Sequence, residues 1–135
     1  MPTKRADLWK RMALVTLDTA KSLRDHPDSR SCVSRIYYAA YQAAASVSIT
    51  HGDAAQFPPG WNNPSHQQLP DLVQNNADFT PSARRTAARI LRLLRNFRED
   101  ADYRPGRTVD AVTVKTALLA VATLFEVLEL NDDND

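Results

Sequence analysis

The sequence contains only one cysteine, Cys32, and three glycines among its 135 residues. One cysteine excludes an intramolecular disulfide, and histidine and cysteine do not cluster at the spacing of a metal site. A glycine-rich phosphate loop is missing as well, so we expect no metal and no cofactor. No apolar run is long enough to cross a bilayer, and the first residues lack the apolar segment of a signal peptide. We therefore expect a cytoplasmic protein that does not associate with a membrane.

Strand-type alternation is also missing, whereas alanine and leucine recur at helical spacing. Thr80-Pro81 and Asp110 are typical helix starts, and breakers concentrate in a loop from His51 to Pro64. These signals predict four long helices and one short helix, over residues 6–24, 29–49, 65–74, 81–101 and 110–130. We predict an all-α fold, a single domain over residues 1–135. Its helices form an up-and-down bundle that ends in an acidic tail at about residues 131–135.

Two features of the apolar pattern concern packing. In the first helix, the expected buried stripe consists of Leu8, Met12, Val15, Leu17, Ala20 and Leu23. The second helix has a run of alanines, which indicates that a neighbouring helix approaches it closely. The second helix and the third long helix each have more buried-type surface than one seam of a bundle needs. This surplus predicts a homodimer that brings two Arg98 residues near a shared cleft.

Positive charge is concentrated in the third long helix, although the formal net charge of the chain is only +1. Between Arg84 and Arg107 there are eight arginines and three acids. This segment favours a polyanionic partner, or attraction to the acidic tail within a dimer. Three of its arginines face outward: Arg85, Arg89 and Arg92. They form either an ordinary solvated face or an RNA-binding face.

Arg98 differs from those arginines because it lies on the shoulder of the apolar stripe. It is followed four residues later by Asp102, so the two side chains can pair on one turn. An arginine at the edge of a core is costly to leave unpaired. Arg98 therefore either pairs with Asp102 or binds a phosphate from a ligand.

The second helix combines polar and aromatic residues beside its small-residue core. Arg35, Tyr38 and Gln42 are spaced i, i+3 and i+7 and share one face. Tyr37 and Tyr41 form a second pair nearer the core, where a tyrosine packs with its ring and hydrogen-bonds with its hydroxyl. The polar row is either the edge of a tyrosine-rich core or one wall of a ligand site.

Two segments together resemble the signature helices of the HEPN superfamily, small helical domains often found in prokaryotic toxin–antitoxin and defence systems. Residues 34–44 read SRIYYAAYQAA and are similar to the SRAYYAMFHAA pattern of the branch encoded beside nucleotidyltransferases. Residues 98–103 read REDADY and are similar to that branch's Arg-x-x-Ala-Asp-Tyr. Ser65-His66 resembles a further dipeptide of the family. The resemblance covers about residues 5–130 and implies a helical bundle that forms dimers.

The chain departs from the pattern of catalytic HEPN ribonucleases in its histidines. Those enzymes carry a histidine four to six residues after an arginine, and no histidine follows Arg95 or Arg98. Gln42 stands at the position of the family's histidine in the tyrosine-rich helix, and Ala101 stands where a related toxin pattern has one. We expect His66, in a predicted loop, to be a surface residue; the alternative is that it reaches the site from that loop. Without an imidazole near Arg98, proton transfer lacks its usual carrier.

The residues and the resemblance together favour a non-catalytic or weakly catalytic protein that binds RNA or a nucleotide in a toxin–antitoxin or phage-defence system. The expected binding residues are Arg35, Tyr38, Gln42, Arg85, Arg89, Arg92, Arg95 and Arg98. One alternative is a metal-independent ribonuclease toxin whose variant site consists of Arg98, Asp102 and Tyr103. A second alternative is a subunit that docks another protein, and the resemblance implies a nucleotidyltransferase as that partner.

Overall fold

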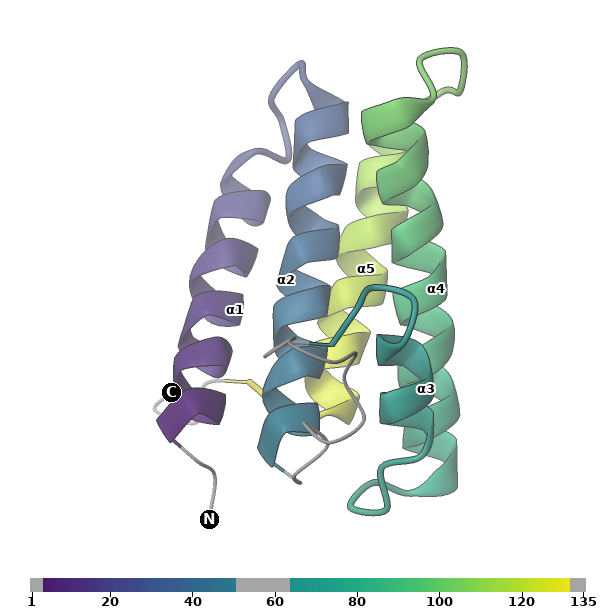
Figure 1. The fold of residues 1–135 in the computed structure, drawn as a ribbon. Coiled ribbons are helices and arrows are strands. Elements are labelled where there is room, and N and C mark those ends of the chain that lie inside the picture. Colours follow the sequence, from purple (N-terminus) through teal and green to yellow (C-terminus); the bar gives the residue numbers. More distant parts are fainter. Residues whose placement is uncertain (1–3, 51–63, 132–135) are drawn as a thin grey trace.

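Four long helices and one short helix make up the fold in the computed structural model, which describes residues 4–50 and 64–131. The helices are α1 (Lys4–Ser22), α2 (Ser29–Thr50), α3 (Leu69–Gln74), α4 (Pro81–Tyr103) and α5 (Ala111–Val127). The long helices run alternately up and down, and α3 packs against α2 and α4 (Figure 1). The predicted all-α bundle is confirmed. The predicted loop over residues 51–64 lies outside the described residues except for its last position.

Capping residues fix the starts of α4 and α5. The Thr80 hydroxyl accepts a hydrogen bond from a backbone N–H of the first turn of α4, and Pro81 occupies a first-turn position where its missing N–H costs no helical hydrogen bond. The Asp110 carboxylate accepts from the N–H of Thr113, whose side chain closes a capping box. Both predicted starts are therefore confirmed. The short helix begins later than predicted, at Leu69, because a turn precedes it.

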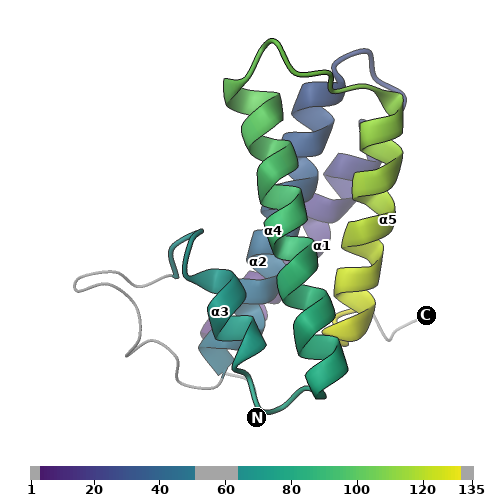
Figure 2. The same ribbon diagram turned by 90° about the vertical axis from the view of Figure 1, so that its right-hand side faces the viewer.

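The central helix of the bundle is α2, which packs against α1, α4 and α5 (Figures 1 and 2). Small side chains allow close helix packing, and five alanines of α2 are completely buried: Ala39, Ala40, Ala43, Ala44 and Ala45. Large buried side chains from α2, α4 and α5 fill the space around them, including Ile36, Leu94, Leu124 and Phe125. Helices of the same chain thus cover the alanine face. Within the described residues, packing inside the chain therefore accounts for the alanine face of α2, and the predicted homodimer stays a prediction.

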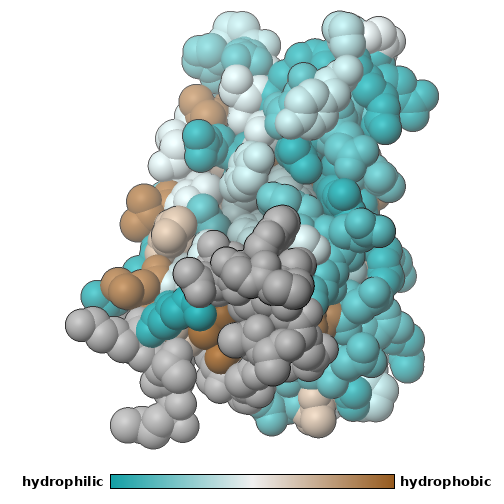
Figure 3. Space-filling model, viewed as in Figure 1, coloured by the Kyte–Doolittle hydropathy of each residue, from teal (hydrophilic) through white to brown (hydrophobic). Residues whose placement is uncertain are grey.

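The buried face of α1 differs from the predicted stripe. Leu17 and Ala20 are buried as predicted, but three of the larger residues are exposed: Leu8 by 52%, Met12 by 45% and Val15 by 65%. Instead, α1 turns its small residues Ala6 and Ala13 inward. Short side chains let the α1 backbone approach α2 closely, so alanines occupy the contact and the larger apolar residues face outward. Hydrophobic surface is visible along the edge of the molecule formed by α1 (Figure 3).

Candidate functional site

Arg98, near the end of α4, is a buried cation surrounded by tyrosines. The residue is only 8% exposed. Its guanidinium carbon lies 5.2 Å from the ring centre of Tyr37, 5.8 Å from that of Tyr38 and 5.6 Å from that of Tyr103. These are cation–π distances, and the attraction offsets part of the cost of removing the charge from water. Two of the rings belong to α2, so the packing of α2 against α4 builds the site.

Of the two alternatives for Arg98, the ion pair with Asp102 does not form. No carboxylate within residues 4–50 and 64–131 lies at ion-pair distance from the Arg98 guanidinium. Asp102 instead accepts a hydrogen bond from the hydroxyl of Ser34 at 3.2 Å. The Nε atom of Arg98 is fully buried and has no hydrogen-bond partner in the described part of the chain. Among the described residues the charge of Arg98 therefore has no counter-ion, which favours binding of an anion.

His66 reaches the same tyrosines from the turn before α3, so our expectation of a surface histidine is wrong. Its Nδ1 atom lies 2.6 Å from the hydroxyl oxygen of Tyr37, within hydrogen-bond distance. The imidazole also packs against Tyr41, with 4.5 Å between ring centres. Tyr41 donates a hydrogen bond to the carbonyl oxygen of Pro64, which holds the turn against α2. A loop thereby supplies the imidazole that α4 lacks. We use "the Arg98 site" for Arg98, Tyr37, Tyr38, Tyr103 and His66.

Burial and the neighbouring arginines set the protonation states in the Arg98 site. Burial lowers the pKa of His66 below its ordinary value of about 6.5, and the positive charges of Arg98 and Arg95 lower it further. Burial raises the pKa of Tyr37 to about 12. At neutral pH the imidazole is therefore uncharged and the phenol is protonated. The positive charge at the site is carried by arginine.

Gln42 and Arg95 lie one turn from Tyr38 and Arg98 along their respective helices. The Oε1 atom of Gln42 is buried and has no partner among the described residues. Arg95 lies 3.3 Å from a carboxylate oxygen of Glu99, so its charge is balanced within α4. These two predicted residues extend the Arg98 site along the contact between α2 and α4. In contrast, the predicted residue Arg35 is exposed, and no hydrogen bond or ion pair ties it to the described part of the site.

The outer arginines of α4 form a separate basic surface. Arg85, Arg89 and Arg92 are all exposed, as the helical projection predicts. Arg92 lies 3.1 Å from a carboxylate oxygen of Asp71 on α3, an exposed ion pair that contributes little to stability. This row faces solvent, whereas the Arg98 site faces the contact with α2.

Arg30, a residue that sequence analysis did not single out, caps the C-terminal end of α4. Its guanidinium donates hydrogen bonds to five backbone carbonyls: those of Asp100, Ala101, Arg104, Pro105 and Arg107. The last carbonyls of a helix have no partners within the helix, so this side chain satisfies groups that would otherwise need water. Tyr103 lies within the capped segment, so Arg30 also holds the backbone that carries one ring of the Arg98 site. The sequence carries no signal for this contact, because the acceptors are backbone atoms 70–77 residues away.

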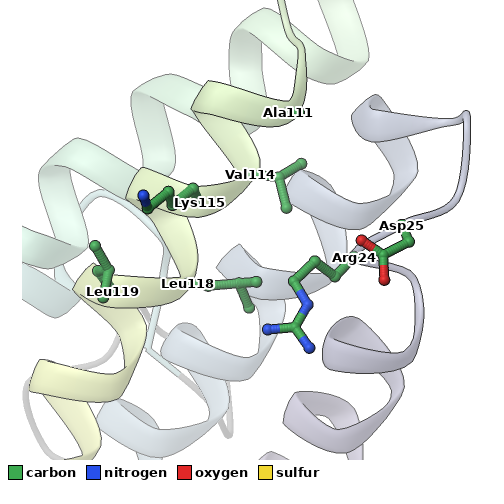
Figure 4. Close-up of a pocket in the computed structure, with 7 residues that line it drawn as sticks. All are labelled: Arg24, Asp25, Ala111, Val114, Lys115, Leu118 and Leu119. Atoms are coloured by element: carbon green, nitrogen blue, oxygen red, sulfur yellow. The ribbon is translucent and has the colours of Figure 1, made fainter.

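Other kinds of site are missing from the described residues. Within residues 4–50 and 64–131, histidine, cysteine, aspartate and glutamate form no group that could hold a metal ion. Over the same ranges no helix has the length and apolar character needed to span a membrane. A cavity of about 410 Å³ lies between the end of α1 and the start of α5 (Figure 4). It is lined by Arg24, Asp25, Ala111, Val114, Lys115, Leu118 and Leu119, and it shares no residue with the Arg98 site.

The family model described as HEPN domain matches residues 6–131, nearly the whole chain. The matched region includes every residue of the Arg98 site. No curated protein sequence matches the chain.

Proposed function

Because the chain belongs to the HEPN domain family, we propose that it binds RNA or a nucleotide, with a phosphate group held at the Arg98 site. The observation that carries this proposal is the buried guanidinium of Arg98, which has no carboxylate partner among the described residues. Cation–π attraction stabilises a cation but leaves its charge in place. A phosphate oxygen supplies both the negative charge and the hydrogen-bond acceptors that a guanidinium needs.

The aromatic surroundings favour a single-stranded nucleic acid over a lone inorganic anion. Tyr103 is 70% exposed and lies beside Arg98, so a base can stack on its ring while the adjoining phosphate contacts the guanidinium. Stacking on aromatic side chains combined with basic residues is a common way of binding single strands. The exposed row of Arg85, Arg89 and Arg92 offers further phosphate contacts on the same helix.

Salt dependence tests whether the outer row contributes to RNA binding. We expect the affinity for a short single-stranded RNA to fall as salt rises, with a slope of about −0.7 per phosphate contact in a logarithmic plot. Replacing Arg85, Arg89 and Arg92 with alanine should make that slope shallower by about two, measured by fluorescence anisotropy at graded salt. An unchanged slope would assign the row to solubility and leave the Arg98 site as the binding surface.

The position of His66 favours a second candidate function, a metal-independent ribonuclease. In the tautomer whose Nδ1–H donates to Tyr37, the Nε2 atom of His66 carries a lone pair and can accept a proton. The 2′-hydroxyl of RNA would give its proton to Nε2 as its oxygen bonds to phosphorus and the bond to the 5′ oxygen breaks. The protonated imidazole or water would return a proton to the 5′ oxygen. The products are a 2′,3′-cyclic phosphate end and a 5′-hydroxyl end, while Arg98 stabilises the charge on the phosphate.

A cleavage assay separates the two candidates. We expect at most slow cleavage of labelled single-stranded RNA in the presence of a metal chelator. The lowered pKa of His66 leaves the imidazole uncharged at neutral pH but makes it a weaker base, so it takes the proton of the 2′-hydroxyl less readily. Any activity should be lost in His66→Gln, which keeps a polar side chain but cannot carry the proton. Rapid cleavage that disappears in both His66→Gln and Arg98→Ala, and persists in His26→Gln, would make the ribonuclease the main function.

The biological setting of the proposal rests on family membership. A toxin–antitoxin or phage-defence role, a nucleotidyltransferase partner and an interaction-only subunit all agree with an RNA-related HEPN domain. RNA binding that depends on Arg98 supports the leading proposal over the interaction-only alternative. Co-purification with a nucleotidyltransferase encoded beside the gene, without any RNA affinity, would support that alternative instead.

A further inference from the structure

The cavity between the end of α1 and the start of α5 has the size and lining of a small-molecule pocket (Figure 4). Its volume is about 410 Å³, and ligand pockets typically measure about 300–1,000 Å³. We propose that this cavity binds an organic monocarboxylate with an apolar body, such as a medium-chain fatty acid, whose carboxylate pairs with Arg24. The cavity shares no residue with the Arg98 site, so this inference does not depend on the proposed RNA binding.

The packing of the helices explains why the cavity exists. Helix α1 packs against α2, and α5 packs against α2 and α4, but within the described residues α1 and α5 do not pack extensively on each other. Interlocking side chains therefore do not close the edge of the bundle between these two helices. The turn after α1 and the first half of α5 border the cavity, where the small side chain of Ala111 leaves room for a ligand.

Three apolar side chains of α5 form one wall of the cavity: Val114, Leu118 and Leu119. Val114 is buried, Leu118 is half-buried and Leu119 is 64% exposed, so this wall runs from the core to the surface. An apolar ligand that covers Leu118 and Leu119 removes their surface from water, which is favourable in proportion to the area covered. The wall therefore favours a ligand with an apolar body over a small inorganic anion.

The charged side chains of the cavity suit a ligand with a single negative charge. Arg24 and Lys115 are positive and Asp25 is negative, so the two positive charges exceed the one negative charge by one. No ion pair with a described residue occupies any of these three side chains. Figure 4 shows the Arg24 side chain extending from the turn after α1 toward Leu118 on α5. Its guanidinium can therefore bind a carboxylate whose apolar body lies on the α5 wall.

An NMR titration with octanoate tests both parts of the proposed ligand. We expect saturable binding with a Kd of about 1 mM or lower, and amide signals that shift at Arg24 and along the first half of α5. Octanol lacks the charge and acetate lacks the apolar body, so each should bind about tenfold more weakly or less. Octyl phosphate should bind no more tightly than octanoate, because the cavity balances one negative charge.

Three results of this titration would overturn the proposal. Octanol that binds as tightly as octanoate would remove the role of the carboxylate. Octyl phosphate that binds more tightly would remove the assignment to a monocarboxylate. Octanoate that shifts no signal near Arg24 and the start of α5 would remove the site itself.

Substitutions in the cavity locate the ligand independently. Ala111→Trp places a bulky side chain in the cavity and should abolish octanoate binding. Val112→Trp is the matched control, because Val112 is 72% exposed and does not line the cavity, and it should bind octanoate normally. The NMR spectrum of each variant confirms that it is folded. Equal octanoate binding by the two variants would contradict the proposed site.

Charge substitutions test the role of Arg24. Arg24→Gln should weaken octanoate binding by about tenfold or more, since it loses a charge-assisted hydrogen bond. Arg11→Gln removes an exposed arginine of α1 outside the cavity and should leave the affinity unchanged. Asp25→Asn removes a repelling carboxylate and should tighten binding about two- to fivefold. Equal affinities for Arg24→Gln and Arg11→Gln, or weaker binding by Asp25→Asn, would count against the carboxylate contact.

Discussion

Replacing Arg98 with alanine is expected to weaken the binding of short single-stranded RNA by about 10- to 100-fold. The estimate follows from the loss of one charge-assisted hydrogen-bonded contact, worth about 1.5–3 kcal/mol. The loss should be large because the guanidinium is held in place by three tyrosine rings and has no carboxylate within the described residues to compete with a phosphate. Fluorescence anisotropy at constant, moderate salt measures the affinity.

Two variants serve as controls for Arg98→Ala. Arg11→Ala removes an exposed arginine from α1, outside the expected binding residues, so it should lower affinity only slightly. Arg98→Lys keeps the charge but loses the planar fork and its stacking on the tyrosines, and it should bind with intermediate affinity. Circular dichroism confirms that each variant is folded. Equal losses for Arg98→Ala and Arg11→Ala would show that binding follows net charge and not the Arg98 site.

Replacing Arg30 with alanine is expected to lower the free energy of unfolding by about 2–4 kcal/mol. Hydrogen bonds to a charged group contribute about 1.5–3 kcal/mol each when well formed, and solvent can replace part of this set because several acceptors are exposed. The Arg30 guanidinium donates to the carbonyl of Asp100 at 2.8 Å and to that of Ala101 at 3.2 Å, both part-buried. Losing these bonds should fray the last turn of α4. Urea unfolding followed by circular dichroism gives the free energy.

The same helix offers a matched control for Arg30. Arg35 is an exposed arginine of α2, and Arg35→Ala should change stability by less than about 0.5 kcal/mol. The Arg30→Ala variant should also bind RNA more weakly, because Tyr103 loses its fixed position beside Arg98. If the Arg30→Ala and Arg35→Ala variants were equally stable, water would satisfy the backbone carbonyls at the end of α4 as well as Arg30 does.

The helices could be predicted from the sequence because their signals are local. Thr80 and Asp110 cap helices with atoms that lie within three residues along the chain. The spacing of their own residues makes the tyrosine-rich helix and the arginine-rich helix candidates for the walls of a site, with a purely structural role as the alternative for each. Their contact follows from the bundle, so Tyr38 and Arg98 did come together.

The sequence could not predict contacts that depend on how separate elements pack. His66 lies 29 residues from its partner Tyr37, and only the path of the chain before α3 brings the imidazole to the tyrosines. Asp102 has a candidate partner four residues before it, but the packing of α2 on α4 offers the hydroxyl of Ser34 instead. On α1, we predicted that large apolar residues face the core, whereas close packing against α2 places alanines there. In each case the contact depends on how separate parts of the chain pack, which local spacing does not show.

The central claim is that a phosphate group of the ligand binds beside Arg98, within reach of His66. The most direct test is the pKa of His66, followed by NMR as a pH titration of its imidazole signals with and without saturating single-stranded RNA. In the free protein, burial and the charges of Arg98 and Arg95 hold this pKa below 6.5. A bound phosphate offsets those charges, so the account predicts that the pKa rises when RNA binds and that the rise is lost in Arg98→Ala. A His66 pKa that stays the same while RNA is bound would place the RNA elsewhere on the molecule and contradict the account.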